Sequence, residues 1–121
     1  MTKPFTINHI EIPAPDLAKG IQFYSTLFNW EFEVLSENEY AFFKIGDTGT
    51  GGGLDATLQP ANEKQGVQFV ISVDDIPTKL KKIEESGGAI TKEKTEIPGG
   101  LGFYACFVDP NGNHVQMHCM E

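Results

Sequence analysis

The stretches His9-Ile-Glu-Ile-Pro-Ala-Pro-Asp16 and Gln68-Phe-Val-Ile-Ser-Val-Asp-Asp75 have similar patterns and begin 59 residues apart. In each, a run typical of a β-strand is followed by an aspartate that opens a stretch with helical spacing of its apolar residues. A period of this length in a chain of 121 residues indicates two copies of one supersecondary unit. The chain is therefore expected to fold from two similar halves, in which His9 and Gln68 occupy matching positions.

The first copy begins with a strand and a helix. Residues 5–12 alternate between apolar and polar side chains, which puts His9 and Glu11 on the same face of a half-buried strand. Asp16 is a good N-cap for the helical stretch that follows, and Asn29 stands where a left-handed residue would end that helix. His9 and Glu11 thus become candidates for a site on the polar face of the strand.

Three further strands complete the first copy, and we expect them at residues 30–35, at 40–45 and near Leu54. A glycine-rich run, residues 49–53, comes before the last of them. This run lacks the Lys-Ser/Thr ending of a phosphate-binding loop and the helix that follows such a loop. We therefore expect a flexible hairpin tip there.

The second copy repeats the order of elements. Asp75 caps its helix and Gly87-Gly88 ends it, and because Gly88 lies 59 residues after Asn29, we expect both residues to adopt a positive φ. The turn Asp109-Pro-Asn-Gly112 joins the last two strands. Strands are predicted at residues 67–73, 89–94, 102–108 and 113–120.

Composition limits the domain organisation and the class of partner. The length and the 40% hydrophobic content predict one domain, residues 1–121, made of a module at about 5–57, a linker at 58–66 and a module at about 67–121. The net charge is −8, and all nine basic residues are lysines. Without arginine the chain has no bidentate fork for phosphate, and its field repels polyanions. Nucleic acid is excluded as a partner, whereas cationic or neutral small molecules are compatible with this charge.

The two cysteines and the N-terminal residues bear on the compartment. Folding the last hairpin about its turn puts Cys119 opposite about residue 103, too far from Cys106 for a disulfide. Two free thiols are typical of the reducing cytoplasm. The first residues lack the apolar stretch of a signal peptide, and no run reaches membrane-spanning length. We expect a cytoplasmic protein with no membrane contact.

A strand, a helix and three strands, repeated once, resemble the vicinal oxygen chelate superfamily, which includes glyoxalase I, bleomycin-resistance proteins, fosfomycin-resistance enzymes and extradiol dioxygenases. The likeness covers nearly the whole chain. The most specific motifs are Asp16-Leu17, Phe23-Tyr24, Leu27-Phe28-Asn29-Trp30 and Asp109-Pro-Asn-Gly112. Together they are similar to bacterial proteins related to lactoylglutathione lyase.

The resemblance implies an α+β fold of two βαβββ modules, whose mixed sheets curve together into a glyoxalase-like incomplete barrel with the ligand in the cleft they enclose. It also implies four metal-binding positions, which fall on His9, on about Gly53, on Gln68 and on Gln116. Only His9 is a good ligand for a divalent transition metal. The sequence therefore predicts no metal site and no cofactor, because three of the four positions carry poor ligands.

Strand alternation and the resemblance together nominate the remaining site residues. Glu11 is a candidate catalytic base, and a carboxylate at a cavity rim has the same sequence signature. His118 shares a face of the last strand with Gln116 and with His114, which adjoins the turn and is expected to be solvated. Trp30 and Phe42 are candidates for an apolar pocket wall, although aromatic residues at such spacing also form cores. The candidate ligand-binding set is His9, Gln68, Gln116, His118, Trp30 and Phe42.

These observations favour a protein of unassigned reaction that binds a small molecule in the cleft without a metal. The alternative is a divalent-metal-dependent lyase or isomerase of the lactoylglutathione lyase type, in which a carboxylate moves a proton. A third possibility is an interaction module that retains only a vestigial cavity. The resemblance also implies a homodimer.

Overall fold

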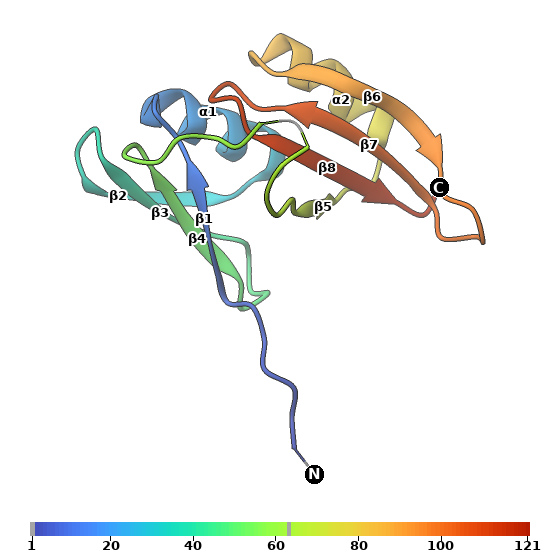
Figure 1. Ribbon diagram of the computed structural model, residues 1–121, viewed down its shortest axis with the longest axis horizontal. Helices are drawn as coiled ribbons and strands as arrows, with labels where there is room; N and C mark the ends of the chain where they lie inside the picture. The colour runs from blue at the N-terminus through green and yellow to red at the C-terminus, as the bar shows by residue number, and fades with distance from the viewer. Residues whose placement is uncertain (1, 63) are drawn as a thin grey trace. The chain divides into compact units, whose positions relative to one another are not determined.

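The computed structural model describes residues 2–62 and 64–121 (Figure 1). The chain divides into two compact units, Met1–Gln59 and Pro60–Glu121. The boundary between them falls inside the predicted linker. Each unit contains one helix and one four-stranded mixed sheet, in the order strand, helix, three strands. The predicted α+β fold of two βαβββ modules is confirmed, and each sheet is open, with two edge strands.

In unit 1 the first and last strands in the chain are neighbours in the sheet. The strand order is β1-β4-β3-β2, with β1 parallel to β4 and the other pairs antiparallel. A parallel neighbour requires a crossover, which α1 supplies. The elements are β1 (His9–Pro13), α1 (Leu17–Phe28), β2 (Glu31–Ser36), β3 (Tyr40–Lys44) and β4 (Gly51–Asp55).

Helix α1 forms because its sequence provides both ends and an apolar stripe. Asp16 accepts a hydrogen bond from the Lys19 backbone N–H at 3.1 Å, as an N-cap should, and Asn29 ends the helix with φ of 59°. The helix buries Phe23, Tyr24 and Leu27. The buried apolar side chains of the strands are those of Ile12, Ala41, Phe43 and Leu54. Because side chains alternate along each strand, the next residues point to the side of the sheet away from α1, and we call that side the open face of unit 1.

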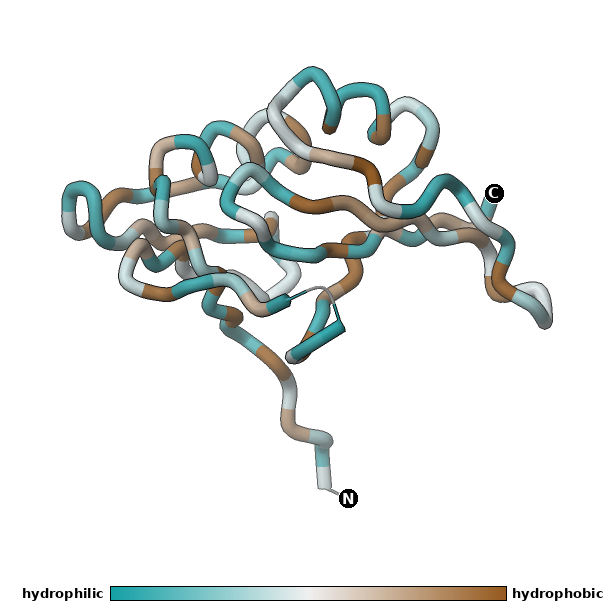
Figure 2. Tube along the Cα trace, turned by 45° about the horizontal axis from the view of Figure 1, so that its top comes forward, coloured by the Kyte–Doolittle hydropathy of each residue, from teal (hydrophilic) through white to brown (hydrophobic). Residues whose placement is uncertain are grey.

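The first strand is shorter than predicted. Pairing with β4 begins at His9, and residues 2–8 form an extended segment ahead of it. This segment is held at its end by a bond from the Gly51 N–H to the Asn8 carbonyl and by one from the Thr50 hydroxyl to the Ile7 carbonyl, both 2.9 Å. Phe5 and Ile7 are exposed. Figure 2 shows brown, apolar positions along the N-terminal segment, which runs away from the sheet.

The expected flexible hairpin tip at residues 49–53 is wrong for its second half. Gly51 and Gly52 pair with β1 on one side and with β3 on the other, as part of β4. Glycine is required here because the neighbouring strands leave no room: a Cβ on Gly52 would overlap the Ile10 carbonyl and the Phe43 ring. The turn itself lies earlier, where Gly49 has φ of 84°.

Unit 2 repeats the topology with the order β5-β8-β7-β6, β5 and β8 being parallel. Its elements are β5 (Val70–Ser72), α2 (Ile76–Glu85), β6 (Ala89–Glu96), β7 (Phe103–Val108) and β8 (His114–Cys119). Its core contains Ile83 from α2 with Phe107 and Met117 from the sheet, each fully buried. No helix in the described part of the chain is both long and apolar enough to cross a bilayer.

Two details of unit 2 differ from the prediction. The strand predicted at 67–73 is shorter, Val70–Ser72, with one further backbone hydrogen bond to β8 at Phe69 and one at Val73, and Val67 is fully exposed. The helix is also shorter than α1, ten residues against twelve, so the positive φ falls on Gly87, at 93°, and not on Gly88. The spacing of 59 residues between the copies therefore holds where the helices start and is one residue shorter at the residues with positive φ that follow them.

The last hairpin follows the prediction closely. Asp109 Oδ1 accepts hydrogen bonds from the backbone N–H groups of Asn111 and Asn113, which fixes the turn between β7 and β8. Phe103 stands opposite Cys119, and Cys106 stands opposite Gln116. Both cysteines are free thiols, as this register requires.

Candidate functional site

Three polar side chains meet on the open face of unit 1. His9 Nε2 and Glu11 Oε2 are in hydrogen-bond contact on β1, and the Tyr40 hydroxyl on β3 donates to the same Glu11 oxygen at 2.6 Å. The Tyr40 oxygen lies 3.4 Å from His9 Nε2. We call these residues the His9–Glu11–Tyr40 cluster. An ionised carboxylate only accepts hydrogen bonds, so this geometry uses an imidazole that donates through Nε2.

The strand register explains how residues 31 positions apart come together. Strand β4 lies between β1 and β3, with Gly53 opposite Glu11 on one side and opposite Phe42 on the other. Gly53 has no side chain to separate the strands on this face. Tyr40 therefore reaches diagonally across β4 to Glu11, which is within the range of a long aromatic side chain.

The surroundings of Tyr40 hold its proton firmly. Burial, the hydrogen bond to Glu11 and the negative charges of Glu11 and Asp55 together raise the pKa of the Tyr40 phenol to about 12. The phenol is consequently a proton donor throughout the neutral range. Its role in the cluster is that of a neutral hydrogen-bond donor and not that of a phenolate.

Phe42 forms an aromatic wall beside the cluster. Its ring makes edge contacts with the imidazole of His9, at 6.0 Å between centroids and 85° between planes, and with the Tyr40 ring, at 5.4 Å and 79°. The Phe42 side chain is nevertheless 42% exposed. An exposed ring next to open polar groups gives the face both an apolar and a polar element, as small-molecule sites have.

The matching face of unit 2 carries a different set of groups. Two side-chain amides are bonded to each other there: Gln116 Nε2 donates a hydrogen bond to Gln68 Oε1 at 3.0 Å. Cys106, opposite Gln116, is half-buried, and burial raises the pKa of its thiol although the charge of Lys92 opposes the shift. His118 Nε2 donates to the Leu101 carbonyl at 2.7 Å, so its ring is tied to the loop before β7.

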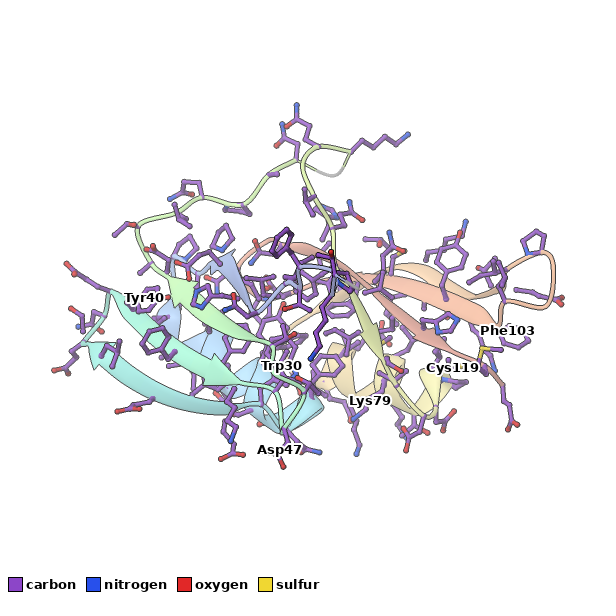
Figure 3. The ribbon with its side chains drawn as sticks, turned by 90° about the horizontal axis from the view of Figure 1, so that it is seen from below. Trp30, Tyr40, Asp47, Lys79, Phe103 and Cys119 are labelled. Carbon is purple, nitrogen blue, oxygen red and sulfur yellow. The ribbon has the colours of Figure 1, made fainter. Side chains whose placement is uncertain are left out.

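The structure brings some of the predicted site residues together and leaves others apart. His9, Glu11 and Phe42 form one group, and Gln68 and Gln116 form another. Trp30 belongs to neither: it is 5% exposed and stacks between Tyr24, at 4.8 Å, and Phe43, at 4.5 Å, in the core of unit 1. Figure 3 labels Trp30 and Tyr40 in these separate places.

Tyr40 is the site residue that sequence reasoning missed. The signal was present, because alternation along the predicted strand puts Tyr40 on the same face as Phe42. What the sequence did not supply was the register of β3 against β4, which decides that Tyr40 reaches Glu11.

The donor atoms do not fit a divalent transition metal. Of the positions that the resemblance implies, Gly53 has no side chain, and the amides of Gln68 and Gln116 are bonded to each other. Neutral amides bind such ions weakly. Within residues 2–62 and 64–121, no group of three or more His, Cys, Asp or Glu side chains is arranged to hold a metal ion. We therefore derive no chemical step through a metal.

Comparison with known proteins decides the family. The model of the Glyoxalase/Bleomycin resistance protein/Dioxygenase superfamily matches residues 6–117, nearly the whole chain. The chain belongs to this superfamily. Among curated relatives of this glyoxalase-superfamily protein, a probable lactoylglutathione lyase from Vibrio cholerae is 30% identical over 121 aligned positions, which cover 92% of this chain and 88% of the relative.

Solved structures agree on the fold of this superfamily member. A glyoxalase/bleomycin resistance protein/dioxygenase family enzyme from Burkholderia phytofirmans superposes with a TM-score of 0.76 at 12% identity, covering 94% of this chain and 98% of that one. A mutant fosfomycin resistance protein from Listeria monocytogenes, complexed with Mn(II) and a dihydroxypropylphosphonic acid, has a TM-score of 0.71 at 18% identity and covers 98% and 90%. At such identities the likeness concerns the fold alone.

Proposed function

We propose that this chain binds a small molecule without a metal ion, at the His9–Glu11–Tyr40 cluster. The observation that supports this most strongly is the 2.6 Å hydrogen bond from the Tyr40 hydroxyl to Glu11 Oε2, made across a glycine at position 53. The three side chains hold one another through hydrogen bonds. Ligands of a cation would instead direct their donor atoms at a common point between them.

Glu11 Oε1 is the atom that we propose for the ligand. Within the described part of the chain Oε1 accepts no hydrogen bond, because both donors of the cluster bond to Oε2. A carboxylate oxygen beside the exposed Phe42 ring suits an ammonium or N–H donor attached to an apolar group. The net charge of −8 and the absence of arginine also favour a cationic or neutral ligand over an anionic one.

The amide pair of unit 2 is proposed as ligand contacts on the face of its own sheet. Gln68 and Gln116 are half-buried and present amide groups on their face of the sheet. His118 is proposed as a contact through the other atoms of its ring, because its Nε2 already donates a hydrogen bond to the Leu101 carbonyl. Amides can pair with neutral donors and acceptors, which fits a ligand group without a strong charge.

A lyase or isomerase of the lactoylglutathione lyase type is the second candidate. The Vibrio cholerae relative favours it, and so does Glu11, which is bonded to two proton-bearing groups and could serve as a general base. Against it stand the poor metal-binding residues and the lack of an arginine to clamp a dicarboxylate substrate.

Ligand screening in the presence of a chelator tests the proposal. Thermal stabilisation would be measured with amines that carry an apolar group, with their uncharged analogues and with carboxylates, each with and without EDTA. We expect the amines to stabilise the protein equally in both conditions and to lose their effect in Glu11→Gln. Glu84→Gln, the same charge change on the exposed face of α2, is the matched control and should keep it. Stabilisation that requires added metal would contradict the proposal.

We also propose that the protein is cytoplasmic and forms a homodimer. Two free thiols suit a reducing compartment. Sedimentation equilibrium would measure the assembly state, and a mass of one chain at micromolar concentration would contradict the dimer.

A further inference from the structure

Position 53 and the Tyr40 hydroxyl compete for the same space. A Cβ built on Gly53 would overlap the Tyr40 hydroxyl and would lie 2.6 Å from Glu11 Oε2. Real Cβ atoms do not come this close to other heavy atoms. The bond between Tyr40 and Glu11 therefore exists only because residue 53 is a glycine.

The Tyr40 hydroxyl in turn blocks a longer side chain at position 53. Gly53 is the position on β4 from which the resemblance would draw a metal ligand, and it pairs directly with Glu11 on β1. A longer side chain there would have to enter the volume that the Tyr40 hydroxyl fills. With Tyr40 in place, a donor atom from position 53 cannot approach His9 and Glu11.

We infer that Tyr40 and Gly53 act as one specificity-determining pair, in which the tyrosine hydroxyl occupies the place of a metal ligand and makes the site selective for hydrogen-bonding ligands over divalent cations. The inference rests on the proposed function in taking the His9–Glu11–Tyr40 cluster as the binding site. It adds that two residues, Tyr40 and Gly53, are the reason why the cluster binds no divalent cation.

A mutant cycle on stability tests the shared space. Gly53→Ala should lower the melting temperature in the wild-type background and should lower it much less in Tyr40→Ala, where the obstacle is gone. Gly51→Ala is the matched control: its Cβ would meet the Phe43 carbonyl and not Tyr40, so its cost should be the same in both backgrounds. An equal cost of Gly53→Ala with and without Tyr40 would overturn the inference.

Cobalt binding tests the change of selectivity. Co(II) would be titrated into wild type, Tyr40→Ala, Gly53→Glu and the double variant Gly53→Glu/Tyr40→Ala, with absorbance as the readout and circular dichroism as a check of folding. The double variant should bind Co(II) with a Kd at least about tenfold below that of wild type, because His9, Glu11 and the new carboxylate can then converge. A folded double variant with no gain would overturn the inference.

Different results would contradict the proposed function and the role of Tyr40 and Gly53. Near-stoichiometric metal in purified wild type would contradict the proposed function itself. Additive effects of the two positions, in a wild type that is metal-free and binds amines, would contradict only the role given to Tyr40 and Gly53.

Discussion

Replacing Tyr40 by phenylalanine removes the hydroxyl from the cluster and leaves the ring in place. The ring keeps its edge contact with Phe42 at 5.4 Å, so the main loss is the hydrogen bond to Glu11. A bond to a charged group contributes about 1.5–3 kcal/mol where both partners are buried. The Glu11 side chain is 39% exposed, and water can replace the lost donor. We therefore expect Tyr40→Phe to lower the free energy of unfolding by roughly 1 kcal/mol.

Urea unfolding of a mutant cycle with Glu11→Gln measures the interaction itself. The two changes should be coupled by about 0.5–1 kcal/mol, because each removes one partner of the same bond. Tyr104→Phe is the matched control: Tyr104 is a half-buried tyrosine on β7 for which the described residues provide no hydroxyl partner, and its loss should stay within about 0.3 kcal/mol. Equal losses at Tyr40 and Tyr104, with no coupling to Glu11, would refute this description of the cluster.

Three further predictions concern single features. The pKa of Tyr40 in the folded protein, about 12, lies above its usual value near 10. The protonated phenol therefore contributes its full stabilisation of the fold below pH 10, and this contribution is lost as the pH rises through 12. The phenolate absorbance of wild type, compared with that of Tyr40→Phe, measures this titration. Asn29→Ala should lower the free energy of unfolding by about 1 kcal/mol while Asn29→Gly changes it little, since φ is 59° at that residue. Urea unfolding measures both variants, and an alanine variant as stable as wild type would contradict this. Cys106 and Cys119 should react slowly with a thiol reagent at neutral pH and rapidly after unfolding, because burial raises the pKa of the Cys106 thiol and Cys119 is buried; fast modification of the native protein would be inconsistent with that burial.

The fold could be predicted from sequence because its signals are local and occur twice. The capping aspartate, the helical stripe and the closing turn at Asp109–Gly112 each depend on residues close in the chain, and the hairpin that places Cys119 opposite Phe103 follows from the turn alone. Where the signals depend on neighbours, prediction failed. The run of glycines suggests a loose tip by composition, yet Gly52 pairs within β4, where the Ile10 carbonyl and the Phe43 ring leave room for no larger residue.

The candidate site was predicted in part for the same reason. Alternation on one strand put His9 and Glu11 together, and this grouping needed no knowledge of other strands. Tyr40 required the register between β3 and β4, which no local pattern fixes. Trp30 was nominated as a pocket wall because an aromatic residue at the start of a strand has the same pattern whether it lines a pocket or, as here, stacks in the core.

The metal content of freshly purified wild-type protein, measured by mass spectrometry beside His9→Ala, tests the central claim most directly. A cluster held together by hydrogen bonds predicts far less than one equivalent of zinc, nickel, manganese or iron, with no difference between the two proteins. Near-stoichiometric metal in wild type that is lost in His9→Ala would contradict the account.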